Sequence, residues 1–336
     1  MEQSLAMLAQ LFGGLALFLY SMDTLTRALQ QAAGAGLKNA LARLTGSPLA
    51  GVFAGLVVTM VLQSSSAVTV LVLGFVSAGL LPLRRAVPVV FGANIGTTVT
   101  AQLLAFRLED VRHLLLFAGL LLWFFWKEGR IHAAGEALFA FGLLFEGITV
   151  MAEALQPLAE SPVFRQWMVQ VQHRPGLGLL AGLGMTLTVQ SSSATIAVLQ
   201  RTAAQPGPEC GCLLGLAGAV PVLLGDNIGT TITAVLASIG QPRSAKQLAA
   251  AHCVFNLSGA VLCLGLLPQF VQLVEVLSPK GPAAAVLPRQ IANAHTLFNV
   301  FCTLLWLPLT PLLLELVTRL VPEKDRKAAA KHIFEL

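Results

Sequence analysis

The sequence predicts an all-helical, polytopic membrane protein made of two related halves. Two observations lead to this fold class: an apolar composition and an internal duplication. The 336 residues are 56% hydrophobic and 11% charged, with a mean hydropathy of +0.77, whereas soluble domains carry about 25% charged residues. Because the bilayer core holds no water to pair with backbone groups, we expect the membrane segments to be helices.

The internal duplication consists of two short polar sequence blocks, each of which occurs twice. Gln-Ser-Ser-Ser occurs at 63–66 and again at 190–193, 127 positions further on, and each copy is followed by Gly-x-Asn-Ile-Gly-Thr-Thr, at 92–98 and 225–231. The same order of the two blocks in both halves predicts two structural repeats. We therefore expect a first transmembrane repeat over 1–130, a second over 131–321, and a short charged C-terminal tail over 322–336.

In the first half, residues 5–30 predict a membrane helix that is retained, since the N-terminus lacks the basic opening and cleavage site of a secretory signal. The next apolar run, 48–81, is divided by the first Gln-Ser-Ser-Ser block. Each arm is shorter than the roughly 20 residues of a full crossing, so a helical hairpin or an interrupted helix is expected. A span over 87–106, interrupted at its two glycines, and an apolar segment over 114–126 follow.

The second half repeats this plan. Residues 134–156 mirror the first helix, 161–174 read as a polar connection, and Pro175 opens the run that leads to the second Gln-Ser-Ser-Ser block. Three further apolar stretches lie at 213–239, 249–277 and 288–321. An odd number of crossings in the first half would make the repeats inverted in topology. The basic tail predicts a cytoplasmic C-terminus in the inner (plasma) membrane.

The Gln-Ser-Ser-Ser blocks offer neutral oxygen ligands. On a helix, Thr59, Gln63 and Ser66 form one polar stripe, which the second copy repeats. Hydroxyl and amide oxygens suit a small cation such as sodium, and hydroxyls with freed N–H groups at a helix break suit an oxyanion equally well. The alternative is that these hydroxyls bond back to their own helix, but duplication of the whole arrangement favours a ligand site.

In the Gly-x-Asn-Ile-Gly-Thr-Thr blocks, two glycines four residues apart are expected to weaken the helix, so that Asn and Thr oxygens line a cavity at the break. The alternative is a glycine-mediated helix contact with the Asn bonded across it. Asp226 is the one acidic residue in either block. We expect it to face the cavity and to serve ion coordination, with proton coupling or a buried hydrogen bond as alternatives.

These paired blocks resemble those of the type II sodium-dependent phosphate cotransporter family over about 45–300. The resemblance implies sodium-coupled import of inorganic phosphate by alternating access, with substrate and ions between the repeats. Many bacterial members continue into a PhoU-like domain, whereas this sequence ends at Leu336, so the branch without that domain is expected. The candidate ligands of phosphate and sodium are Gln63, Ser64, Ser65, Ser66, Asn94, Thr97, Thr98, Gln190, Ser191, Ser192, Ser193, Asp226, Asn227, Thr230 and Thr231.

Sodium is the expected coupling ion, with no other cofactor, and the expected partners are phosphate, sodium and lipid but not nucleic acid. Alternatives are another transported anion, proton coupling, or a sensor that binds phosphate without moving it. A hydrolase is disfavoured because the sequence has no Gly-x-Ser-x-Gly elbow. A third repeat pair, Ala-His-x-x-Phe-Asn at 251–256 and 294–299, favours hydrogen bonding between helices over substrate contact.

Overall fold

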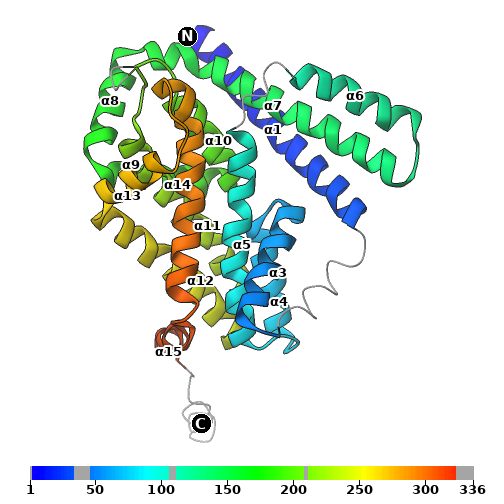
Figure 1. The fold of residues 1–336 in the computed structure, drawn as a ribbon, viewed down its shortest axis with the longest axis vertical. Helices are drawn as coiled ribbons and strands as arrows, with labels where there is room; N and C mark the ends of the chain where they lie inside the picture. Colours follow the sequence, from blue (N-terminus) through cyan, green and yellow to red (C-terminus); the bar gives the residue numbers. More distant parts are fainter. Residues whose placement is uncertain (1, 34–45, 106–110, 208–210, 323–336) are drawn as a thin grey trace, which may run out of the picture.

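The computed structural model describes residues 2–33, 46–105, 111–207 and 211–322. In these residues the elements of secondary structure are helices, as the composition predicts. They are α1 (Glu2–Ala33), α3 (Pro48–Leu62), α4 (Ser65–Ser77), α5 (Leu83–Leu104), α6 (Arg112–Phe125), α7 (Gly129–Glu160), α8 (Pro162–His173), α9 (Pro175–Val189), α10 (Ser192–Ala203), α11 (Leu216–Ala237), α12 (Arg243–Gly265), α13 (Leu267–Val276), α14 (Ala283–Trp306) and α15 (Thr310–Leu320). Figure 1 shows α5, α11, α12 and α14 in the body of the molecule, with α6 and the adjoining part of α7 projecting to one side.

The first Gln-Ser-Ser-Ser block separates α3 from α4. Ser47 caps α3 by accepting a hydrogen bond from the Ala50 amide at 3.2 Å, and Pro48 fits the first helical position because its missing N–H has no partner there. Gln63 ends α3 in the left-handed conformation, with φ 51° and ψ 21°. Ser64 then caps α4 through the Ala67 amide at 3.1 Å. The interruption predicted at this block is therefore confirmed.

Glycines bring α3 and α5 into direct backbone contact. A Cβ added to Gly55 would lie 1.9 Å from the carbonyl oxygen of Val89, and one added to Gly92 would lie 1.8 Å from that of Val52. No residue with a side chain fits at either position.

The same contacts give the direction of the chain. A Cβ on Gly51 would meet Pro88 near the start of α5, and one on Gly96 would meet Thr59 near the end of α3, so α3 and α5 run in parallel. Only residues 78–82 join α4 to α5, so α4 must return to the end where α3 began. Helices α3 and α4 therefore form a helical hairpin with its tip at the Gln-Ser-Ser-Ser block.

The second half repeats this hairpin with α9 and α10. Gln190 is left-handed, with φ 53° and ψ 25°, and Ser191 caps α10 through the Ala194 amide at 3.3 Å. Added Cβ atoms on Gly182 and Gly225 would lie 1.8 and 1.9 Å from carbonyl oxygens of the facing helix. The duplicated sequence thus builds a duplicated unit of hairpin and long helix.

The bases of the two hairpins lie near opposite ends of α5. The first base lies beside its start, where Gly51 meets Pro88. Near the second base, the Gln200 Nε2 donates to the carbonyl oxygen of Ala101, close to the end of α5, at 3.1 Å. Figure 1 shows the same arrangement, with α3 and α4 towards the lower end of the body and α9 and α10 towards the upper end.

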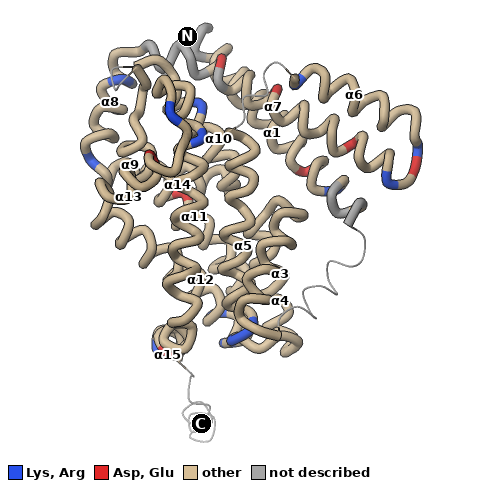
Figure 2. The backbone as a smooth tube through the Cα atoms, viewed as in Figure 1, with Lys and Arg blue, Asp and Glu red and all other residues tan. Residues whose placement is uncertain are grey.

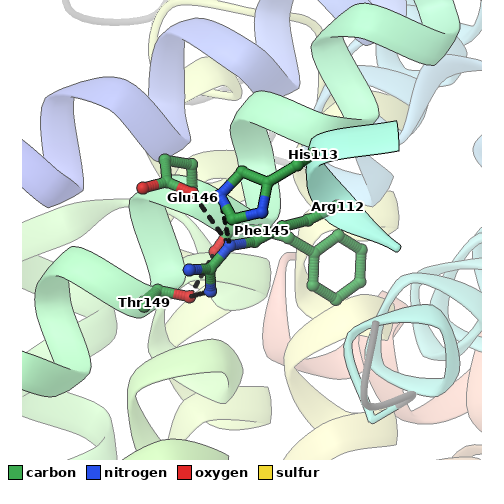
Figure 3. Close-up of polar contacts among 5 residues, drawn as sticks. All are labelled: Arg112, His113, Phe145, Glu146 and Thr149. Atoms are coloured by element: carbon green, nitrogen blue, oxygen red, sulfur yellow. Dashed lines mark hydrogen bonds and ion pairs between the residues drawn. The ribbon is translucent and has the colours of Figure 1, made fainter. Parts of the chain in front are cut away.

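Helices α1 and α7 have equal lengths of 32 residues, start 127 positions apart, and pack against each other through Gly14 and Gly147. Helix α6 folds back on α7. At its start the Arg112 Nε lies 3.1 Å from Glu146 Oε2, and its Nη1 donates to Thr149 Oγ1 at 2.8 Å (Figure 3). These contacts fix the beginning of α6 on α7.

Two predictions about elements need correction. Residues 161–174 are not a polar connection but contain α8, because Ser161 and Pro162 start a helix and its apolar side chains Met168 and Val171 are buried. The apolar stretches 249–277 and 288–321 are each divided, into α12 with α13 and α14 with α15. The second pair bends by 87°, where residues 307–309 separate the two helices.

Among the described residues, five helices are long and apolar enough to cross a membrane, or six if α14 and α15 count as one bent span. The protein is therefore a multi-pass membrane protein. Figure 2 shows few charged residues in the middle of the body. The predicted tail lies outside the described residues from 323 onward.

Candidate functional site

The two hairpin tips meet around one polar cavity of about 160 Å³. Both Gln-Ser-Ser-Ser blocks line it in full, although they are 127 residues apart in sequence. We call this the tip cavity, and its lining residues are Met22, Asp23, Thr26, Gln63, Ser64, Ser65, Ser66, Thr97, Gln190, Ser191, Ser192 and Ser193. Hollows of about 200 Å³ elsewhere are lined almost wholly by apolar side chains, such as Met168 and Leu199.

Two helices begin at this cavity. Helix α4 starts at Ser65 and α10 at Ser192, each after its serine cap. The first amides of a helix have no partner within the helix, and the aligned peptide dipoles place about half a positive charge at each N-terminus. The tip cavity therefore combines serine hydroxyls with two partly positive helix ends, which suits an anion.

The two glutamines shape the tips through the backbone. Among the described residues, Gln63 and Gln190 are the non-glycine residues with positive φ, a conformation that costs about 1–3 kcal/mol outside glycine. The Gln63 side chain is also held: its Oε1 accepts from the Thr100 hydroxyl at 2.7 Å and its Nε2 donates to the Met60 carbonyl oxygen at 2.5 Å. The tip is thus fastened to α5.

The predicted break at the Gly-x-Asn-Ile-Gly-Thr-Thr blocks is wrong. Helices α5 and α11 run through them without interruption. The threonines bond back to their own helix, as when Thr98 Oγ1 donates to the Ile95 carbonyl oxygen at 2.8 Å and Thr231 Oγ1 to that of Ile228 at 2.7 Å. The glycines are there because the hairpin backbone passes so close to them. Of the predicted residues in these blocks, Thr97 lines the tip cavity, whereas Asn94, Thr98, Asp226, Asn227, Thr230 and Thr231 do not.

The asparagines of the Gly-x-Asn-Ile-Gly-Thr-Thr blocks join helices by bonding to the histidines of the Ala-His-x-x-Phe-Asn pair. Asn94 Nδ2 donates to the Val90 carbonyl oxygen, which leaves its Oδ1 to accept from His252 Nε2 at 3.3 Å. Asn227 and His295 make the same contact at 3.3 Å. Each imidazole must carry its proton on Nε2 to donate in this way. The predicted hydrogen bonding between helices is therefore present in both copies.

Asp226 is completely buried and lies outside the lining of the tip cavity, contrary to the expectation that it faces the cavity. Its Oδ1 accepts from the Thr186 hydroxyl at 2.5 Å, and that hydroxyl lies 3.3 Å from Thr195 Oγ1. Its Oδ2 has no hydrogen-bond partner among the described residues. A cation, a proton or a water would satisfy this oxygen.

Sequence reasoning missed the contribution of α1 to the cavity. Met22, Asp23 and Thr26 line it from one face of that helix, where their spacing of three to four residues places them together. The available signal was that the predicted helix over 5–30 carries polar residues from Asp23 to Arg27, but these residues belong to neither repeated block. Their position depends on how α1 packs against the hairpins.

The cavity lining offers hydroxyls, amides, one carboxylate and the thioether of Met22. Among the described residues no group of three His, Cys, Asp or Glu side chains could hold a metal ion. A family model for the Na+/Pi-cotransporter matches this chain twice, over residues 17–153 and 146–277. The chain belongs to the Na+/Pi-cotransporter family. Membership supports phosphate transport as the activity and agrees with the several apolar helices.

Several relatives resemble this family member. YqeW of Bacillus subtilis (strain 168), whose name states no function, is 36% identical over 78% of this chain and 83% of its own length. The "Putative inorganic phosphate export protein YjbB" of Salmonella typhimurium is 26% identical over 81% of this chain and 49% of its own length, so the chain spans about half of that relative. The human "Sodium-dependent phosphate transport protein 2B" is 39% identical over 31% of this chain and 15% of its own length. No solved structure matches.

Proposed function

We propose that this protein imports inorganic phosphate together with sodium and that phosphate binds in the tip cavity. The observation that carries this proposal is the meeting of both Gln-Ser-Ser-Ser tips at one polar cavity. Serine hydroxyls and helix N-terminal amides donate hydrogen bonds to an oxyanion, and family membership makes phosphate the first anion to consider. Neutral oxygens of Gln63 and Gln190 are suited to sodium.

The predicted residues outside the cavity lining have a supporting part in this proposal. Asn94 and Asn227 fasten α5 and α11 to the histidine-bearing helices, and the block threonines bond to their own helix. Asp226 bonds to Thr186, which lies one helical turn before Gln190 of the second tip, and its other carboxylate oxygen has no partner in the described part of the chain. We propose that it serves ion coordination there or orients a group that does.

We further propose that the halves form an inverted-topology repeat and work by alternating access. Support comes from the two hairpins, whose bases lie near opposite ends of α5 while their tips share one cavity. In this arrangement, movement of one repeat relative to the other would open the cavity to each side in turn. A cytoplasmic C-terminus and a place in the inner (plasma) membrane belong to the same proposal.

Transport in proteoliposomes tests the proposal. The purified full chain should accumulate labelled phosphate when sodium is higher outside, because the sodium gradient supplies the driving force. Replacement of sodium by potassium at equal ionic strength is the control. Equal uptake in potassium would contradict sodium coupling, and phosphate binding without any uptake would favour a sensor. Competition by sulfate or dicarboxylates at equal concentration would indicate a different anion.

Export is the second candidate for direction, because the YjbB relatives are named for phosphate export. Cells that lack their own phosphate uptake systems separate the two directions. With import, expression of this chain should raise the rate at which labelled phosphate enters. With export, it should instead speed the loss of label from preloaded cells.

A further inference from the structure

Among the described residues that line the tip cavity, Asp23 is the only one with a charge. It comes from α1, outside both repeated blocks, and its side chain is 67% exposed. A carboxylate beside an anion site repels the anion and attracts a cation. The charge of Asp23 therefore affects what the cavity can hold.

The charges at the cavity do not balance when phosphate is present. A phosphate group carries about −1.5 to −2 at neutral pH, and Asp23 adds one further negative charge. The N-termini of α4 and α10 contribute about half a positive charge each. The negative charge thus exceeds the positive by roughly one and a half to two units, which one or two monovalent cations would neutralise.

Arg27 does not already supply this charge. Its Nη2 lies 3.2 Å from Asp23 Oδ2 and donates to Thr24 Oγ1 at 3.3 Å, and Arg27 is absent from the cavity lining. The pair is exposed, with 55% of the Arg27 side chain accessible, and exposed pairs of this kind are weak. Asp23 can therefore leave Arg27 for another cation at little cost.

We propose that Asp23 makes phosphate binding in the tip cavity conditional on a sodium ion, by repelling the unaccompanied anion and by ligating the cation that accompanies it. This inference rests on the proposed function and extends it to a residue of α1. Thr26, on the same face, adds a hydroxyl oxygen to the site. Asp226 lies outside the cavity lining, so the carboxylate in direct contact with the cavity is that of Asp23.

Equilibrium binding of labelled phosphate to the purified full chain, in sodium chloride and in choline chloride at equal ionic strength, tests the inference. Asp23→Asn keeps the shape and removes the charge. It should raise phosphate affinity in choline at least fivefold, and it should reduce the gain in affinity that sodium gives by about tenfold, within the usual range of coupling between two ligands. Asp23→Glu should keep most of the sodium gain.

Two further variants make the result specific. Glu153→Gln removes an exposed carboxylate from α7, away from the cavity lining, and should behave as wild type. Arg27→Gln should keep or increase the sodium gain, because it releases Asp23. The inference is overturned if Asp23→Asn binds as wild type in both salts, or if Arg27→Gln loses the sodium gain instead. A wild-type chain that binds phosphate equally in the two salts contradicts the proposed sodium coupling, and the choline affinity of Asp23→Asn then decides whether Asp23 repels phosphate.

Discussion

Gln63 and Gln190 occupy backbone positions that glycine would fill at lower energy. Both keep a side chain despite positive φ, and strain of this kind clusters at functional sites. At both tips, the residue that turns the chain also lines the tip cavity. The positive φ costs stability, whereas the amide side chain lines the cavity. Substitutions can therefore distinguish the effect of the backbone turn from that of the side chain.

Gln63→Ala and Gln190→Ala should each lower the apparent affinity for sodium or phosphate, because each removes an amide oxygen from the cavity. The corresponding glycine variants should lower affinity as well. Their free energy of unfolding should exceed that of the alanine variants by roughly 1 kcal/mol, since glycine accepts positive φ without a steric penalty. Binding assays and thermal unfolding in detergent measure the two effects. Wild-type binding in a well-folded double alanine variant would make these residues structural.

Asp226→Asn should weaken the sodium dependence of transport or change the charge moved per phosphate. The substitution preserves shape and removes the charge on a buried group whose Oδ1 accepts from Thr186 and whose Oδ2 has no partner among the residues that the structure describes. Transport currents at several sodium concentrations provide the measurement. Ala93, its counterpart in the first repeat, supplies a control: Ala93→Ser, a small uncharged change at the matching place, should leave charge stoichiometry as it is. If Asp226→Asn keeps wild-type sodium affinity, stoichiometry and pH profile, the carboxylate only holds Thr186.

For individual residues, the sequence showed which polar residues occur in both repeats, but not which of them line the same cavity. Ser64 and Ser191 could be placed at a helix break because triple serine after an apolar run competes with helix bonding. Asp23 could not be connected with them, since its contact with the cavity arises from tertiary packing of α1. Asp226 stands next to the block asparagine in sequence, yet on a helix adjacent residues point in different directions.

Among the helices, the main error of prediction concerned glycine. Its low helix propensity, about 1 kcal/mol below alanine, suggested breaks in α5 and α11. Close packing against α3 and α9 outweighs this cost, because each glycine allows backbone atoms of two helices to touch. The hairpins themselves were predictable, since their arms are too short to cross a membrane alone.

A pair of glycines on α9 tests this explanation. A Cβ on Gly182 would lie 1.8 Å from the Val222 carbonyl oxygen, whereas one on Gly184 would meet no described residue within 4 Å. Gly182→Ala should therefore destabilise the protein by about 3 kcal/mol or more, at or above the usual cost of overpacking. Gly184→Ala should be neutral or stabilising by up to about 1 kcal/mol, from helix propensity alone. Thermal unfolding of both variants in the same detergent gives the comparison, and equal effects would refute the packing account.

For the whole molecule, duplication in the sequence correctly indicated two copies of one unit. It could not give their relative orientation, because hydropathy does not distinguish short hairpin arms from helices that cross the membrane fully. The number of crossings in the first half therefore stayed open. The position of α1 and α7 against each other was also beyond prediction, although their equal lengths agree with the repeat. Contacts between distant segments, such as Gln200 with Ala101, place the base of the second hairpin near the end of α5.

The proposed inverted repeat predicts that the two hairpin bases lie on opposite sides of the membrane. Leu49 and Gly176 occupy equivalent positions, 127 residues apart, and both are exposed. Leu49→Cys and Gly176→Cys should react with a membrane-impermeant thiol reagent from opposite faces of sealed, oriented vesicles. The parent chain is the control for its own cysteines. Labelling of both variants from the same face would contradict the inverted repeat.

The glycine contacts between each hairpin and its long helix also restrict how the molecule moves. A hairpin that slid by one helical turn, about 5.4 Å, would bring Thr59 to the place that Gly55 occupies beside the Val89 carbonyl oxygen, where even a Cβ does not fit. Sliding is therefore blocked, and each hairpin must move together with its long helix as one rigid unit. A tilt of α5 or α11 would then carry the serines at the hairpin tip with it, so the alternating access proposed above would require two rigid units to separate rather than either one to bend.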